Sequence, residues 1–295
     1  MGINSKGFLT EDQRRDLKRS WMKFSSNPLS VLGLVSVLTV TFFAIFSPWV
    51  APYPQSWERW VDFQNALLAP SWEHWFGTDV FGRDVMSRVM FGFRYDLQMA
   101  VIILIMVVPL GTVLGLIAGY YRGSLVDTLI MRITDIFLAI PSVVLALAIC
   151  SMLEPTLFNS MMAVSVLWWP WYSRLAYGIA SSLKNEYFVQ AAELTGASTT
   201  HILFREILPN CISPIFTKMT LDVGWVILIG STLSFVGLGA QEPLPALGNM
   251  VAAGTKYMPD YWWLTIFPAM AIAFTILGFN LLGDGLRDLL AVEEL

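Results

Sequence analysis

The amino-acid sequence predicts an all-α membrane protein with six transmembrane helices, because of its composition and its long apolar stretches. Hydrophobic residues make up 56% of the 295 positions and charged residues only 14%, whereas soluble domains carry about 25% charged residues. A bilayer core of about 30 Å requires about 20 apolar residues per helix. Stretches of that length occupy residues 30–50, 98–120, 128–153, 158–180, 212–237 and 262–283. They leave little sequence for a soluble catalytic domain.

Basic residues predict how the chain crosses the membrane, because cytoplasmic segments carry an excess of lysine and arginine. The polar tail before the first apolar stretch contains Lys6, Arg14, Arg15, Lys18, Arg19 and Lys23, so we expect this tail in the cytoplasm. Six crossings then return the C-terminus to the same side. Of the 18 lysines and arginines, the segments expected outside keep Arg59, Arg83, Arg88, Arg94 and Lys256.

Composition also excludes two classes of function. The formal net charge of −4 provides no basic surface for nucleic acid. Cys150 and Cys211 lie within or at the end of apolar stretches and have no CxxC spacing. We therefore expect two small buried hydrophobic side chains rather than a disulfide or a metal site.

The cytoplasmic tail, residues 1–28, contains the pattern of an amphipathic helix. Thr10 begins a capping-box sequence, and Leu17, Trp21 and Phe24 recur at i, i+4 and i+7 opposite a basic face. This pattern predicts a helix that lies on the inner membrane surface before the first span. A soluble amphipathic helix is the alternative interpretation.

The remaining chain divides into residues 29–97, with the first span and a long external segment, residues 98–290, with five spans, and a tail at 291–295. Small residues allow helix backbones to approach closely inside a membrane. Three glycines at a spacing of four lie on one face of the second span: Gly111, Gly115 and Gly119. We expect that face to pack against another helix.

Charged side chains within spans are costly in a bilayer and usually face the bundle interior. Arg132 and Asp135 lie three positions apart on one face of the third span, and Asp222 in the fifth span follows Lys218 by four positions. One interpretation of Asp135 and Asp222 is an ion pair that stabilises the fold. A direct functional role is the other.

The fourth span carries aromatic residues near its middle, where the interfacial aromatic belt does not explain them. They are Trp168, Trp169, Trp171 and Tyr172. Packing in the bundle core and lining of a pathway or its gate are both consistent with this position.

The polar stretch 181–210, between the fourth and fifth spans, predicts two short helices on the cytoplasmic side. Gly196 can end the first helix in the left-handed conformation, and Ser198 can cap the second. We expect Pro209 to interrupt continuation into the fifth span. The small residues around the turn leave a smooth surface that a partner protein can approach closely.

This stretch resembles the EAA loop of ABC importer permeases. That loop has a Glu-Ala-Ala sequence, a glycine four residues later and a Leu-Pro whose proline lies thirteen residues beyond the glycine. Two positions depart from the pattern, since Gln190 replaces the first glutamate and Glu206 stands where isoleucine or histidine is common. The resemblance implies that the loop couples the permease to an ATPase through Gln190, Ala191, Ala192, Glu193, Gly196, Ala197, Ser198, Leu208 and Pro209.

The run from His74 to Arg88 is similar to the external segment of the C-type permeases in the oligopeptide/dipeptide branch of this family. Its matching residues include Gly77, Thr78, Asp79, Gly82, Arg83 and Asp84. Further likeness lies at Met131–Asp135, Ser234–Gly239 and Phe279–Asp288, so it runs from about residue 20 to 290. Leu247 departs where tryptophan is frequent, and Ala291-Val292 departs where Asp-Pro is common.

The resemblance implies a type I ABC importer permease in the plasma (inner) membrane of a bacterium or archaeon, with lipid around it. Its expected partners are a homologous second permease, two ABC ATPases and an external solute-binding protein. The solute would be a peptide or peptide-like compound, with nickel complexes, glutathione, opines or sugars as alternatives. ATP and Mg belong to the ATPases, since this chain has no GxxxxGK[ST] phosphate loop, and we expect no cofactor, no metal site and no enzymatic activity in it.

Two rival classes explain less of the sequence. A secondary transporter or channel could have six spans, but it usually shows an internal repeat or ion-binding groups at mid-depth, and residues 181–210 would remain unexplained. An intramembrane enzyme would need a catalytic constellation. The two histidines, His74 and His201, are expected on opposite sides of the membrane.

Overall fold

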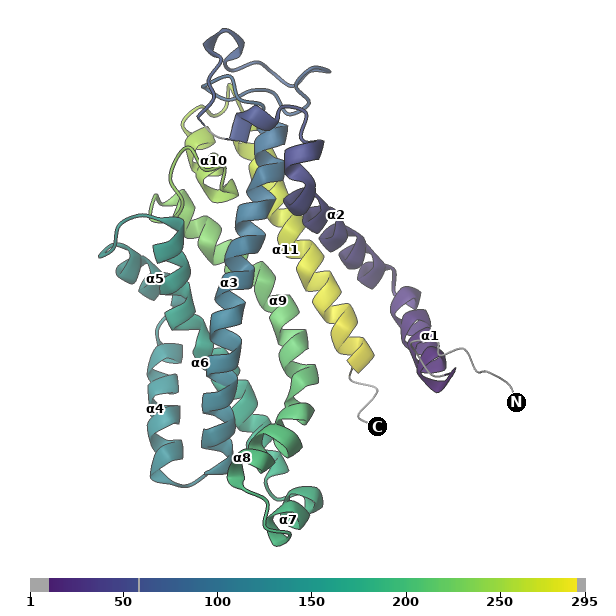
Figure 1. The fold of residues 1–295 in the computed structure, drawn as a ribbon. Coiled ribbons are helices and arrows are strands. Elements are labelled where there is room, and N and C mark those ends of the chain that lie inside the picture. Colours follow the sequence, from purple (N-terminus) through teal and green to yellow (C-terminus); the bar gives the residue numbers. More distant parts are fainter. Residues whose placement is uncertain (1–10, 58, 291–295) are drawn as a thin grey trace.

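Helix α3 (Val85–Tyr120) extends from one end of the molecule to the other, and its 36 residues correspond to about 54 Å. The computed structural model describes residues 11–57 and 59–290, which are mostly helical and contain no strand beyond an isolated Thr78–Asp84 bridge. Figure 1 shows the loops before α3 and the short helix α10 (Leu247–Thr255) at one end, and α7 (Tyr187–Leu194) and α8 (Thr199–His201) at the other. The stretches expected on the external and on the cytoplasmic side of the membrane therefore lie at opposite ends of the molecule.

The three glycines of α3 pack against α6 (Leu157–Leu183), as expected. A Cβ on Gly111 would stand 2.3 Å from the carbonyl oxygen of Trp169, and a Cβ on Gly115 would stand 2.2 Å from that of Ser173. Gly119 meets Ala180 one helical turn further along. Because no side chain fits at these positions, the two backbones approach closely and α3 and α6 form the centre of the bundle.

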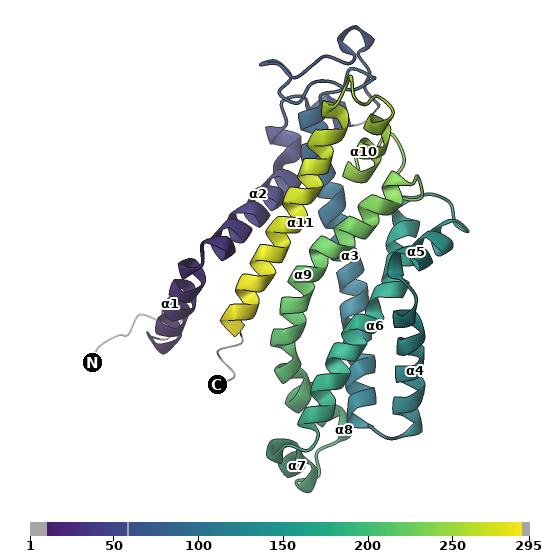
Figure 2. The ribbon, with the colours of Figure 1, turned by 180° about the vertical axis from the view of Figure 1, so that it is seen from behind.

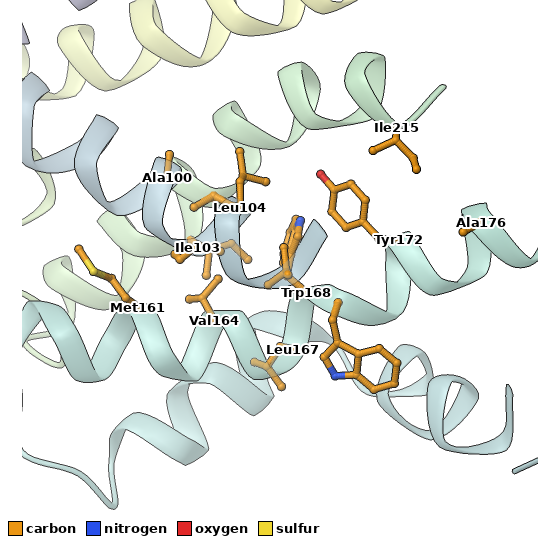
Figure 3. Packing of buried hydrophobic residues seen from close by; sticks show 14 of the residues in the cluster. Ala100, Ile103, Leu104, Met161, Val164, Leu167, Trp168, Tyr172, Ala176 and Ile215 are labelled. Atoms are coloured by element: carbon orange, nitrogen blue, oxygen red, sulfur yellow. The ribbon is translucent and has the colours of Figure 1, made fainter. Parts of the chain in front are cut away.

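The main hydrophobic core lies where α3 and α6 meet α9 (Leu208–Phe235). Figure 3 shows Ile103 and Leu104 of α3 close to Val164 and Trp168 of α6, with the Tyr172 ring between this group and Ile215 of α9. Seen from behind, α11 (Trp263–Leu290) runs beside α9, with α2 (Pro28–Val50) on its outer side (Figure 2).

Four helical stretches in the described part of the chain are long and apolar enough to cross a membrane: Pro28–Val50, Val85–Tyr120, Thr199–Phe235 and Trp263–Leu289. A fifth crossing is reached by counting α4 (Leu125–Ala139) and α5 (Ser142–Cys150) together. Helix α6 has sufficient length, 27 residues, but its tryptophans, serines and Arg174 make it less apolar. Length and composition therefore confirm a helical membrane protein, but not the predicted number of six crossings.

The third predicted span, at 128–153, is not one continuous helix. The helix ends at Ala139, and α5 begins at Ser142 in a direction that differs by 87°. Pro141 explains the break, because it lacks a backbone N–H and disfavours helical geometry at the preceding residue. Ile140 accordingly has an extended conformation, with ψ of 131°.

The N-terminal helix α1 (Glu11–Ser26) lies in the tail where an amphipathic helix was predicted. Phe24 is buried and stacks on exposed Trp21 with ring centroids 6.0 Å apart. The α1 backbone contacts both α2 and α11. Thr10, the expected helix cap, and the tail at 291–295 lie outside the described residues, and contact of α1 with a membrane surface stays a prediction.

Candidate functional site

The turn between α7 and α8 has the geometry that the sequence predicts. Gly196 has φ of +80°, which places it in the left-handed region. The N–H of Gly196 donates to the carbonyl of Glu193 at 3.0 Å, and the N–H of Ala197 donates to the carbonyl of Ala192 at 3.0 Å. These two bonds form a Schellman motif, which satisfies carbonyl groups at the C-terminus of α7.

The second helix begins as expected but continues differently. Ser198 caps α8, since its hydroxyl accepts a hydrogen bond from the N–H of His201 at 3.3 Å. The expectation that Pro209 interrupts the helix before the fifth span was wrong, because α9 starts at Leu208 and Pro209 lies in its first turn. A π-helical segment, Ile202–Ile207, joins α8 to α9. The N–H of Leu208 donates to the carbonyl of Leu203, so the helical path continues past Pro209 although proline has no N–H to donate.

The coupling loop, residues 181–210, has one face anchored to the bundle and one face exposed. Val189, Ile202 and Ile207 are buried, and Ala192 and Ala197 are packed against the core. The opposite face contains Gln190, Ala191, Glu193, Gly196 and Ser198, which are exposed. Of the implied coupling residues, Leu208 and Pro209 lie apart from this face, at the start of α9.

Two exposed apolar side chains on the coupling loop were not identified from the sequence. Leu194 is 89% exposed and Tyr187 is 87% exposed, at the two ends of α7. Figure 1 shows α7 at the extreme end of the molecule, away from the apolar helices of the bundle. Exposed apolar side chains gathered in one place mark contact sites for other molecules. The spacing of seven residues within a short helix could have indicated them.

A polar contact connects the coupling loop to α3. The Tyr120 hydroxyl donates to Oε1 of Glu193 at 2.8 Å, and the Lys184 ammonium lies 5.4 Å from the centre of the Tyr120 ring. Tyr120 is the last residue of α3. The helix that crosses the whole molecule is therefore held directly against α7.

The aromatic group of α6 divides between the core and the surface. Trp168, Trp169 and Tyr172 are buried, whereas Trp171 is 46% exposed. In Figure 3 the Tyr172 ring extends toward α9 and lies near Ile215. The first three residues therefore pack in the bundle, and Trp171 alone among the four presents a large part of its surface outside it.

Asp222 has the partner that its spacing suggested and a second one from α6. Its carboxylate accepts from Lys218 Nζ at 3.1 Å and from Trp168 Nε1 at 3.1 Å. Asp222 is buried, and Lys218 also lies over the rings of Trp171 and Tyr172. This arrangement compensates the buried charge and connects α9 to α6.

Asp135 pairs with a different arginine from the one its spacing suggested. The guanidinium of Arg174, on α6, donates to Oδ1 of Asp135, on α4. Arg132 is exposed instead. Both side chains of the Asp135–Arg174 pair remain almost half exposed at 43% and 48%. Helix-to-helix distance, rather than spacing along one helix, decided the pairing.

The external segment is organised around Asp84, the N-cap of α3. One oxygen of Asp84 accepts from the N–H of Ser87 at 2.7 Å, and the other lies 3.0 Å from His74 Nδ1. Gly77 and Gly82 have φ of +74° and +76°. Thr78 is fully buried, and its hydroxyl donates to the carbonyl of Asn65 at 2.6 Å. The Tyr53 ring lies against the His74 ring at a tilt of 33°, and the pKa of its phenol is raised by burial and by the nearby Glu73 and Asp84 carboxylates.

Asp96 is a buried acid that the sequence analysis did not identify. It lies on α3 with 5% of its surface exposed, and its Oδ2 atom has no hydrogen-bond partner in the described part of the chain. The residue fell within the stretch assigned to the external segment, so its depth was not recognised. An aspartate within a continuous apolar helix was the available signal.

Other chemical sites find little support in the described residues. They contain no group of three or more His, Cys, Asp or Glu side chains placed to hold a metal ion. Cys150 and Cys211 are free and buried, as expected. His74 lies in the external segment, and His201 lies in the coupling loop, in α8 at the other end of the molecule.

A bundle of membrane-spanning helices with an anchored loop exposed at one end is the architecture expected of a membrane permease. Residues 111–292 match the family described as binding-protein-dependent transport system inner membrane component. Residues 17–70 match the N-terminal transmembrane domain of oligopeptide transport permease C. The chain belongs to this family of ABC importer permeases, in its oligopeptide/dipeptide branch.

Named relatives agree along nearly the whole chain. The probable D,D-dipeptide transport system permease protein DdpC of Escherichia coli K12 is 42% identical over 273 residues, which cover 92% of this chain and 90% of the relative. The dipeptide permease DppC of Alkalihalophilus pseudofirmus is 40% identical, covering 92% and 88%. The glutathione permease GsiD of Escherichia coli O6:K15:H31 is 39% identical, covering 98% and 94%. As a permease subunit the chain is not an enzyme, and ATPase activity resides in partner subunits.

Proposed function

We propose that this chain forms half of the pathway for a peptide or peptide-like solute, delivered by an external binding protein and driven by ATP. The names of the dipeptide permeases that it resembles support this solute class. The second half would come from a homologous permease, either a different chain or a copy of this one. Two ABC ATPases would supply the energy, with ATP and Mg bound on those subunits.

The exposed face of the coupling loop is the observation that carries this proposal. Leu194 and Tyr187 project from α7, while buried Val189 and Ile202 hold the loop to the bundle. An ATPase that covers the exposed face would gain apolar contact. Through the Tyr120–Glu193 hydrogen bond its motion would reach α3. The implied coupling residues Gln190, Ala191, Gly196 and Ser198 lie on this exposed face.

We propose that the chain crosses the membrane six times, with both termini in the cytoplasm. The six crossings would be α2, α3, the bent pair α4–α5, α6, α9 and α11. Helix α6, with 27 residues, measures about 40 Å and is long enough to cross. Single cysteines at Glu73 and Asn185, both exposed, test this topology. They should react with a membrane-impermeant thiol reagent from outside and inside respectively, and reaction of both from outside would disprove it.

Partly exposed charged residues, with Trp171 beside them, are the best candidates for the pathway wall. Arg174 pairs with Asp135, and Lys218 lies 5.6 Å from the ring centre of Trp171, one helical turn before Arg174. Lipid is a poor solvent for such groups, so they favour a water-filled cavity or a second permease. Buried Trp168, Trp169, Tyr172 and Asp222 would support this wall from behind.

Reconstitution tests the function. The chain, assembled with its partner permease, ATPases and binding protein in liposomes, should accumulate a labelled dipeptide only with ATP and Mg. Uptake without ATP or binding protein would favour a secondary transporter or channel instead. Because one relative is a glutathione permease, glutathione is the first alternative solute to compare. Nickel complexes, opines and sugars follow.

A further inference from the structure

Two buried arginines of the external segment share a carboxylate from a distant part of the chain. Arg83 and Arg88 are 4% and 1% exposed. Arg83 NH1 donates to Oε2 of Glu242 at 3.0 Å, and Arg88 NH2 donates to Oε1 of Glu242 at 3.4 Å. One carboxylate thus accepts a hydrogen bond on each oxygen from a different guanidinium. This is how proteins bind a free carboxylate with directional specificity.

The two acidic partners of these arginines are not equivalent. Asp79 is fixed, because its Oδ1 accepts from the N–H groups of Phe81 and Arg83, each at 2.9 Å, and its Oδ2 accepts from Arg83 Nε at 2.7 Å. The Asp79 side chain is 14% exposed, whereas that of Glu242 is 41% exposed. Glu242 lies in the loop between α9 and α10. Glu242 is therefore the partner that can leave.

A small cavity adjoins the charged groups. Its volume is about 50 Å³, and its charged lining residues are Asp79, Arg83, Arg88 and Glu242. Its lining also includes apolar side chains, among them Val85, Met250 and Leu264. Withdrawal of the Glu242 side chain would enlarge the space and leave a charged end beside an apolar wall. Such a space suits a carboxylate that is attached to a small apolar group.

We propose that Arg83 and Arg88 form a carboxylate-binding site for the incoming solute, which the chain's own Glu242 occupies in this conformation. Removal of Glu242 alone would leave two buried cations with one fixed anion, and a buried unpaired charge is strongly unfavourable. Arrival of a solute carboxylate restores the balance, so the loop before α10 opens only in exchange for an anionic group. The inference rests on the proposed function, because it names the part of the peptide that is recognised.

Transport of two matched peptides tests the exchange in the reconstituted importer. One dipeptide has a free C-terminal carboxylate and the other a C-terminal amide, each at a concentration that saturates the binding protein. The wild type should transport the free acid about tenfold faster. Measured per assembled complex, Arg83→Gln should lower the ratio of the acid rate to the amide rate about tenfold, whereas Glu242→Gln should retain the wild-type ratio. Arg59→Gln, at an exposed external arginine, is the matched control and should have no effect.

Chemical rescue tests the site without transport. In the assembled complex, Glu242→Ala should lower the thermal unfolding temperature, and acetate should restore it more than acetamide does at equal concentration. The wild type should not distinguish the two compounds. This measurement remains decisive even if Arg83→Gln fails to assemble. Glu242 is exposed, so its truncation to alanine leaves no cavity in the core.

Three results would overturn the inference. The first is a wild type that transports both peptides equally, and the second is a Glu242→Ala complex that responds alike to acetate and acetamide. The third is an Arg83→Gln complex that has a lower affinity for the binding protein whichever peptide is present. Arg83 would then contact a carboxylate of the binding protein rather than one of the solute. A wild type that imports neither peptide with ATP would instead refute the proposed function, and the acetate measurement would still decide the site.

Discussion

Gly82 in the external segment and Gly196 in the coupling loop have nearly the same backbone conformation in opposite surroundings. Their φ angles are +76° and +80°. A Cβ on Gly82 would stand 1.9 Å from the carbonyl oxygen of Asp62, whereas a Cβ on Gly196 would meet nothing within 4 Å. The same local geometry thus closes a packed turn at one end and leaves an open surface at the other.

The side chains of the two regions show the same contrast between a closed and an open structure. In the external segment, buried Arg83 and Arg88 have their counter-charges within the chain. In the coupling loop, Leu194 and Tyr187 are left exposed. In this conformation the external segment has its charges paired within the chain, while the coupling loop leaves apolar side chains uncovered. We therefore expect mutations of packed turns in the external segment to reduce stability, and mutations of the open turn in the coupling loop to reduce transport.

Gly196→Asp is expected to have the largest effect on function. It should reduce transport by about 100-fold or more, because a desolvated, unpaired charge in a close interface costs several kcal/mol. The bundle should still insert, since the site is open. Transport and copurification of the ATPases are the measurements. Gly237→Asp is the control, with φ of +84° and open space around it at the external end; normal import by Gly196→Asp would refute the coupling role.

Gly82→Ala and Gly196→Ala separate strain from packing. Both changes place a side chain in the left-handed region, at a cost of about 1 kcal/mol. At Gly82 the clash with Asp62 should add about 2 kcal/mol, so the total approaches about 3 kcal/mol. Thermal unfolding in detergent should show the difference. Equal losses of stability at the two glycines would contradict the contrast between a closed and an open turn.

Asp222→Asn tests whether a buried charge in the bundle serves the fold. Trp168 can still donate to the new amide oxygen, but Lys218 loses its anion, so we expect a loss of about 2 kcal/mol. Assembled complex should decrease, while turnover per assembled complex remains normal. Asp135→Asn is the counterpart at a half-exposed pair, where the stability loss should stay below about 1 kcal/mol. Normal assembly with abolished uptake would assign the substituted residue to the mechanism.

Leu194→Ser should have a smaller effect on function than Gly196→Asp. It should weaken ATPase binding about tenfold, as expected when one leucine no longer becomes buried at an interface. The unfolding temperature of the isolated permease should not change, because the side chain is 89% exposed. Met152→Ser provides the control, since Met152 is 86% exposed but lies after α5, away from the coupling loop. An unchanged ATPase affinity for Leu194→Ser would remove this residue from the contact.

Features that depend on neighbouring residues were predictable from the sequence. The glycine spacing of α3 indicated close helix packing, Gly196 indicated the end of α7, and Ser198 indicated the start of α8. Each depends on bonds or spacing within a few residues. The effects of Pro141 and Pro209 show the limit of this reasoning. One proline broke an expected helix, while the other was accommodated by a π-helical segment before it.

The sequence by itself determined that the chain is a helical membrane protein with a capped, small-residue turn in a polar loop, because composition and local hydrogen bonding decide these properties. Tertiary structure alone decided which charges meet. Asp135 pairs with Arg174, 39 positions away, and Arg83 pairs with Glu242, 159 positions away. It also buried Asp96 and exposed Leu194. Partner choice follows distances between helices and the cost of an unpaired charge away from water, and neither is encoded in the spacing along one helix.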